Sequence, residues 1–193
     1  RGMRRKSMGS GGGAASNGPR GPQPPAPSSL DSGPPATIIV PMRIYLTNQD
    51  QKLAAHLDAL KRKPVMGYDR ARLKEKTTTI KVDIADPFEG ERMRVLFGYR
   101  IFPEHIMTFL TQWDQERRSM QVGDTITQQV YLPPIQQFSQ KIVFGVRISE
   151  IIDERERKGF SYETLEGHVE RGISTFTLER LEDRVIFKIQ TYS

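Results

Sequence analysis

The sequence contains no cysteine, which excludes disulfide bonds, thiolate metal sites and cysteine nucleophiles. Its three histidines, His56, His105 and His168, show neither paired-histidine spacing nor an HExxH motif. We therefore expect no metal site and no cofactor. No stretch reaches the roughly 18 uninterrupted apolar residues that a membrane-spanning helix requires, so we expect a soluble protein without a membrane span, cytoplasmic by default.

Large apolar residues are nearly absent from the N-terminal segment. Gly, Pro, Ser and Ala dominate between Gly9 and Pro35, where Leu30 is the only large apolar side chain. Such a segment cannot bury enough surface to offset the entropy lost on ordering. Residues 1–37 are therefore predicted to form a disordered tail.

The formal net charge of +6 is unevenly distributed along the chain. Five basic residues and one acidic residue precede Thr37, so the rest of the chain is nearly balanced. A basic tail can add weak, salt-sensitive affinity for polyanions. We expect nucleic-acid binding at most weakly, through this tail, and we favour a solvated leader over a binding element.

One helix is predicted near the start of the ordered part, residues 38–193, which has the length of a single domain. Leu53, Leu57 and Leu60 recur at helical spacing. Pro64 ends the pattern because proline cannot continue a helix.

Two strands are predicted next. Residues 77–85 alternate, with Ile80, Val82 and Ile84 on one side, which is typical of a strand with one buried face. Residues 93–102 form a second apolar, aromatic-rich strand candidate.

A second helix is predicted over residues 103–119. Its first residue is a proline, which is favoured at the first helical position. Ile106, Phe109, Leu110 and Trp113 would form one apolar stripe. The pattern predicts an amphipathic helix that lies on a sheet.

The remainder of the chain is predicted to be a meander of strands. They are expected over residues 124–132, 141–153, 159–165, 172–180 and 184–192. The last has the clearest inward row, formed by Val185, Phe187 and Ile189. The connections are too short for helical crossovers, so we expect antiparallel pairing. The predicted fold class is α+β, a curved antiparallel meander sheet packed against one or two helices.

One stretch of the sequence resembles a known family. The residues Gly159-Phe-Ser-Tyr-Glu-Thr-Leu-Glu-Gly-His168, followed by Phe176 and the closing Ile189-Gln-Thr-Tyr-Ser193, resemble the family called domain of unknown function 1990. The resemblance is clearest over residues 92–193. It implies no established activity, because the family has none to transfer.

The order of elements also looks similar to the helix-grip fold of START and Bet v 1-like proteins. In that fold a curved sheet wraps around a C-terminal helix and leaves an apolar cavity that suits lipids and other hydrophobic small molecules. Longer relatives in the family continue through such a helix after the position of Ser193. Without it, a sheet face would be exposed and would favour a homo-oligomer.

Four aromatic residues are candidates for lining such a cavity, namely Trp113, Phe109, Tyr131 and Tyr162. Each has an alternative as plain core, which is the commoner role of aromatic residues at helical or strand spacing.

An acid/base cluster is the alternative site. His168 follows Gly167 in a predicted loop and is close in sequence to Tyr162 and Glu166, and these residue types can carry general acid/base catalysis. The favoured alternative is a structural turn in which the glycine permits the backbone and the histidine forms local hydrogen bonds. Ser161 lacks the context of a nucleophile elbow, so a serine hydrolase is not expected.

These observations favour a non-enzymatic binding module for a hydrophobic, lipid-like small molecule. The alternatives are an enzyme of unknown class that uses His168 with Tyr162 and Glu166, and weak polyanion binding through the tail.

Overall fold

An antiparallel sheet dominates the part of the chain that the structure describes. The structure is a computed structural model, and it describes residues 43–82, 88–134, 139–182 and 184–193. The predicted tail over 1–37 and the end of the predicted strand over 77–85 lie outside these residues.

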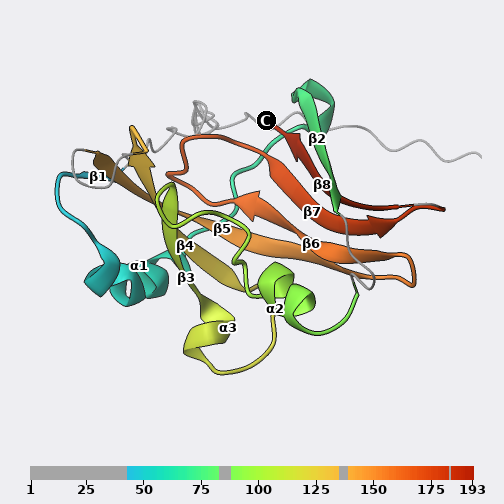
Figure 1. Cartoon of the computed structure of the whole chain (residues 1–193). Helices are drawn as coiled ribbons and strands as arrows, with labels where there is room; N and C mark the ends of the chain where they lie inside the picture. The colour runs from blue at the N-terminus through green and yellow to red at the C-terminus, as the bar shows by residue number, and fades with distance from the viewer. Residues whose placement is uncertain (1–42, 83–87, 135–138, 183) are drawn as a thin grey trace, which may run out of the picture. The chain divides into compact units, whose positions relative to one another are not determined.

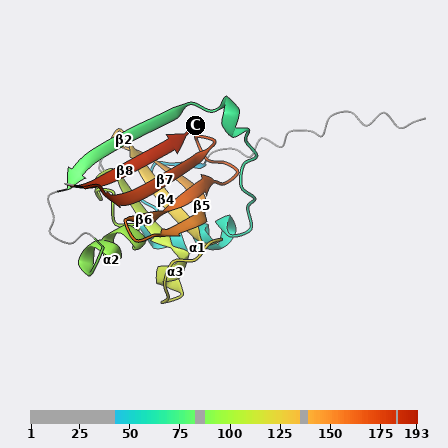
Figure 2. The same ribbon diagram turned by 90° about the vertical axis from the view of Figure 1, so that its right-hand side faces the viewer.

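Eight strands form this sheet, in the order β2-β8-β7-β6-β5-β4-β3, and β1 pairs with β5 off this path. Their bounds are β1 Arg43–Tyr45, β2 Glu75–Val82, β3 Met107–Thr111, β4 Thr125–Leu132, β5 Gln140–Asp153, β6 Arg157–Thr164, β7 Ile173–Arg180 and β8 Val185–Tyr192. The sheet is twisted, and β2 runs along one edge of it beside β8 (Figures 1 and 2). The strands predicted after residue 124 pair as a meander, each with the next, which confirms the predicted α+β fold class.

The helices are short. They are the 3-10 helices η1 Asp50–Lys52 and η2 Arg70–Arg72, and the α-helices α1 Leu53–Leu60, α2 Glu91–Phe97 and α3 Gln112–Gln115. Leu53, Leu57 and Leu60 are all buried, as their spacing predicts. None of the described helices has the length and apolar character needed to cross a membrane.

The two longer helices lie against opposite faces of the sheet. A side chain at Gly145 would meet Leu60 of α1, so α1 covers the face to which residue 145 points. The next residue in β5, Val146, points to the other face, where it shares a buried cluster with Leu96 of α2. We call the face that carries α2 the core face.

Tyr99 lies at the centre of this core. Its side chain is fully buried, and its ring contacts the rings of Phe109, Phe160 and Tyr162. The Tyr99 hydroxyl accepts a hydrogen bond of 2.5 Å from the Gln128 side-chain amide, so this buried polar group is satisfied.

The strand predicted over residues 93–102 is wrong. Residues Glu91–Phe97 form helix α2, which begins after Gly90 and ends at Gly98. A short run of apolar residues fits a buried strand and a buried helix equally well. The helix lies between two glycines, Gly90 and Gly98, and places Leu96 in the core.

The helix predicted over residues 103–119 is also wrong. Met107–Thr111 form strand β3, which pairs with β4, and only Gln112–Gln115 are helical. In the strand, the expected stripe is divided between the two faces of the sheet, with Phe109 on the side of Met107 and Leu110 on the side of Thr108. β-Branched residues such as Thr108 favour the strand.

The residues Glu75–Val82 form a strand, but its expected apolar face is only partly buried. Val82 packs against the core, whereas Ile80 remains 56% exposed. This strand, β2, lies at the edge of the sheet.

Candidate functional site

His168 lies in the loop after β6, beside α1 and β5. Gly167 has a φ of 88°, which glycine adopts at little cost. The His168 ring packs on the Phe144 ring with centroids 4.1 Å apart. Its Nδ1 lies 3.0 Å from the backbone N–H of Glu170 and 2.9 Å from the carbonyl oxygen of that residue. Burial lowers the pKa of His168 to about 4, so the ring is neutral at pH 7.

The other two candidate catalytic residues point elsewhere. Tyr162 lies in β6 and faces the core, where its ring packs on Phe176 at 5.3 Å. Burial raises its pKa. Glu166 is exposed, and its backbone carbonyl accepts a hydrogen bond of 2.8 Å from Lys63. Among the described residues, no hydrogen bond or ion pair joins His168 to Tyr162 or Glu166. The local bonds of His168 fit the structural-turn alternative.

The candidate ligand-binding aromatics separate into three places. Phe109 and Tyr162 come together, because both pack on Tyr99 in the core. Tyr131 lies on the face that carries α1, where Gln129 donates a hydrogen bond of 3.1 Å to its hydroxyl. Trp113, in α3, lines a hollow beside α2.

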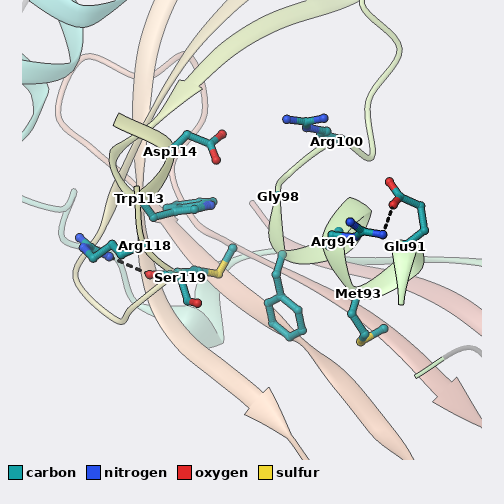
Figure 3. Close-up of a pocket in the computed structure, with 11 residues that line it drawn as sticks. Glu91, Met93, Arg94, Gly98, Arg100, Trp113, Asp114, Arg118 and Ser119 are labelled. Carbon is teal, nitrogen blue, oxygen red and sulfur yellow. Dashed lines mark hydrogen bonds and ion pairs between the residues drawn. The ribbon is translucent and has the colours of Figure 1, made fainter. Parts of the chain in front are cut away.

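This α2 hollow has a volume of about 490 Å³ (Figure 3). Its apolar wall consists of Met93, Phe97, Trp113 and Met120. Its charged residues have both signs and are Glu91, Arg94, Arg100, Asp114 and Arg118. Trp113 is 3% exposed, and its indole N–H has no hydrogen-bond partner among the described residues. The nitrogen itself exposes almost no surface, so a ligand in the hollow reaches it only after the wall moves.

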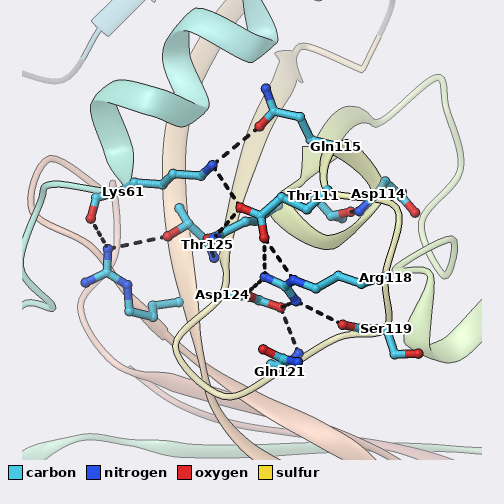
Figure 4. Close-up of polar contacts among 12 residues, drawn as sticks. Lys61, Thr111, Asp114, Gln115, Arg118, Ser119, Gln121, Asp124 and Thr125 are labelled. Carbon is cyan, nitrogen blue, oxygen red and sulfur yellow. Dashed lines mark hydrogen bonds and ion pairs between the residues drawn. The ribbon is translucent and has the colours of Figure 1, made fainter.

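One arginine that lines this hollow forms an ion pair within the chain (Figure 4). Arg118 donates two hydrogen bonds, of 2.7 and 2.6 Å, to the carboxylate of Asp124. The same carboxylate accepts a bond of 2.7 Å from the backbone N–H of Gln121. The Asp124 carboxylate raises the pKa of Arg118. This bidentate pair therefore fixes the loop after α3.

A second recess, the apolar groove, lies on the other side of α2 and has a volume of about 390 Å³. Its floor is a cross-strand row in which Phe187 of β8 lies between Ile80 of β2 and Leu178 of β7. Further apolar lining comes from Val82, Val95, Leu96 and Ile101.

The charged residues of the apolar groove are all cationic. Arg92 and Arg100 line it, and both are exposed. The groove lining contains no carboxylate, in contrast to the α2 hollow, which is lined by Glu91 and Asp114. The apolar groove therefore offers an apolar surface beside positive charge.

The apolar groove was not predicted from the sequence as a site. The alternation of Ile80 and Val82, and the inward row that contains Phe187, were the available signals. Because both patterns were interpreted as plain core, their partial exposure was not foreseen. Within the residues that the structure describes, no group of three or more His, Asp or Glu side chains can hold a metal ion.

Comparison with known proteins gives one match. A family model described as a domain of unknown function, DUF1990, matches residues 91–193, which is more than half of the chain. No curated protein and no solved structure matches the chain.

Proposed function

The chain belongs to the DUF1990 family, whose description states no function, and we propose that it binds a small hydrophobic molecule that carries an acidic group. The apolar groove is the binding site, and the role is non-enzymatic. The observation that carries the proposal is the lining of the groove, in which seven apolar residues are joined only by Arg92 and Arg100.

The volume of the apolar groove and the exposed apolar surface of its floor support a small ligand. A volume of about 390 Å³ falls within the range of roughly 300–1,000 Å³ that is usual for small-molecule pockets. Ile80 is 56% exposed in the groove floor. An apolar ligand that covers this side chain and its neighbours gains about 25 cal/mol for each Å² of apolar surface removed from water.

The two arginines select the polar end of the ligand. Guanidinium groups donate paired hydrogen bonds to carboxylate or phosphate oxygens. Arg92 belongs to the first turn of α2 and Arg100 follows its last turn, so both ends of the helix carry a cation beside the groove. A fatty-acid-like molecule satisfies both the apolar floor and this charge.

The α2 hollow is less suited to such a ligand. Its charged lining includes Glu91 and Asp114, which repel an acid, and Arg118 is bound to Asp124. The unpaired indole N–H of Trp113 is covered. The lining of the apolar groove contains no carboxylate.

The alternatives predicted from the sequence have no such support. A His168-centred enzyme stays a prediction, because His168, Tyr162 and Glu166 form no common cluster in the described part of the chain. Polyanion binding through the tail involves residues outside that part. The helix-grip likeness to START and Bet v 1-like proteins also stays a prediction.

The test is calorimetric titration of the full chain with dodecanoate and with dodecanol, which has the same tail and no charge. We expect dodecanoate to bind more tightly than the alcohol. Ile80→Asp places a negative charge in the groove floor and should weaken dodecanoate binding at least tenfold, a change of about 1.4 kcal/mol or more.

The matched control is Val122→Asp, which changes a residue that is 62% exposed and lies outside the groove. It should bind dodecanoate like the wild type. Equal affinity of the Ile80→Asp variant and the wild type, or no binding by the wild type, would overturn the proposal.

A further inference from the structure

Strand β2 is an edge of the sheet. Residues Glu75–Val82 pair with β8 on one side, and no described strand pairs with the other side. Every residue from Glu75 to Lys81 is exposed. The strand has no proline and its register with β8 is continuous, so its protection against unselective pairing consists of the charged side chains of Glu75, Lys76 and Lys81.

The hydrogen-bond pattern shows which groups point outward from this edge. Lys74 exchanges both backbone hydrogen bonds with Ser193, at 3.0 and 3.1 Å. In an antiparallel ladder such pairs alternate with pairs that exchange none. The even-numbered residues of β2 therefore face β8, and the backbone N–H and C=O groups of Glu75, Thr77, Thr79 and Lys81 point away from the sheet.

We propose that two copies of this chain pair antiparallel through β2, around a twofold axis at Thr78. In this register Glu75 lies opposite Lys81 of the second copy, and Thr77 lies opposite Thr79 of the second copy. All four outward residues then exchange both backbone hydrogen bonds with the partner strand. Each dimer contains two Glu75–Lys81 pairs, because the axis generates the second.

Charge complementarity distinguishes this register from its neighbours. The outward backbone groups stay opposite one another only when the register shifts by two residues. Such a shift moves the twofold axis by one residue, to Thr77 or to Thr79. Centring on Thr77 places Glu75 opposite Thr79, and centring on Thr79 places Lys81 opposite Thr77, so neither register forms the ion pair. Opposite charges directly across two strands stabilise the pairing.

The pairing also changes the surface beside the apolar groove. Ile80 and Lys76 are even-numbered and therefore share the core face of β2. In the Thr78-centred register, Lys76 of the second copy lies opposite Ile80, and its aliphatic stem can cover part of this exposed side chain. An interface of two edge strands is small, so the dimer is expected to be weak and concentration-dependent.

Sedimentation-velocity ultracentrifugation of the full chain over a concentration series tests the proposal. The wild type should show a monomer–dimer equilibrium. Glu75→Lys and Lys81→Glu each replace two attractive pairs with two repulsive ones, so each variant alone should associate at least tenfold more weakly.

Variants with reversed charges at residues 75 and 81 test the register. An equimolar mixture of the Glu75→Lys and Lys81→Glu variants restores both ion pairs and should form a heterodimer. A chain with both substitutions should self-associate like the wild type. Recovery in the mixture also shows that both single variants are folded.

A backbone variant tests the hydrogen bonds. Thr79→Pro removes one outward N–H and no bond to β8, and proline is tolerated at such an edge position. It should remove the dimer and leave the circular dichroism spectrum unchanged. A wild type that is monomeric at every concentration, a Glu75→Lys variant that dimerises as tightly as the wild type, or a failure of the mixture to associate would overturn the proposal.

Discussion

Protonation of His168 should destabilise the fold as the pH falls. The histidine pKa is 6.5 for the free side chain and about 4 in the folded protein, because the ring is buried against Phe144. The unfolded chain therefore binds a proton at a higher pH than the folded one. The stabilising contribution is complete above pH 6.5 and is lost as the pH falls to about 4.

The magnitude follows from the size of the shift. Each unit of pKa difference corresponds to about 1.4 kcal/mol, so the loss across this window reaches about 3 kcal/mol. Urea unfolding at a series of pH values measures it. His168→Asn keeps a polar group near the Glu170 backbone and cannot titrate, so the difference in unfolding free energy between wild type and variant should shrink as the pH falls.

The comparison with the variant removes the contributions of carboxylates, which titrate in both proteins. His105→Asn makes the same substitution at an exposed histidine and is the matched control. A constant difference between wild type and His168→Asn across the window would show that His168 has the same pKa in the folded and the unfolded chain. So would a pKa near 6.5 for His168 in a direct NMR titration.

Three further substitutions test the packing by urea unfolding. Gly159→Ala should cost more than about 3 kcal/mol, because the added methyl group would overlap the backbone of β7; near-wild-type stability would contradict the strand packing. Asp124→Asn removes the charge that holds Arg118 and should cost about 2 kcal/mol, and a neutral effect would show that the pair contributes nothing. Leu57→Ala should cost about 2–5 kcal/mol because the side chain is fully buried, whereas Leu46→Ala, at an 81% exposed residue, should change little.

The sequence predicted the C-terminal half of the fold well because turn residues separate the strands there. Gly123 has a φ of 93° before β4, and Gly172 has a φ of 154° before β7, so the breaks lie where the backbone requires glycine. The alternation between these breaks is the direct signature of strands with one buried face.

The segment between Gly90 and Ser119 was mispredicted because its local pattern is ambiguous. The apolar residues of α2 fit a short strand, and those of β3 fit a helix. Tertiary pairing decides between the two, since β3 gains a complete ladder with β4. Pairing with another strand cannot be predicted from the spacing of the residues within this segment.

The candidate site was likewise predicted only in part from the sequence. Aromatic residues were expected to line a cavity, but Phe109 and Tyr162 pack on Tyr99 and fill the core. The apolar groove depends on where α2 ends relative to the sheet. Its arginines could not be identified from sequence, because Arg100 reaches the groove only once residues 91–97 are helical.

Binding of a hydrophobic acid in the apolar groove can be located residue by residue. Amide correlation NMR spectra of the full chain, recorded during titration with dodecanoate, give this location. We expect the largest shifts on Ile80, Leu96 and Phe187. Trp113 is the only tryptophan, so its indole N–H signal reports the α2 hollow separately. Shifts concentrated on that indole signal, or no shifts at the groove residues, would show that the acid does not bind in the apolar groove.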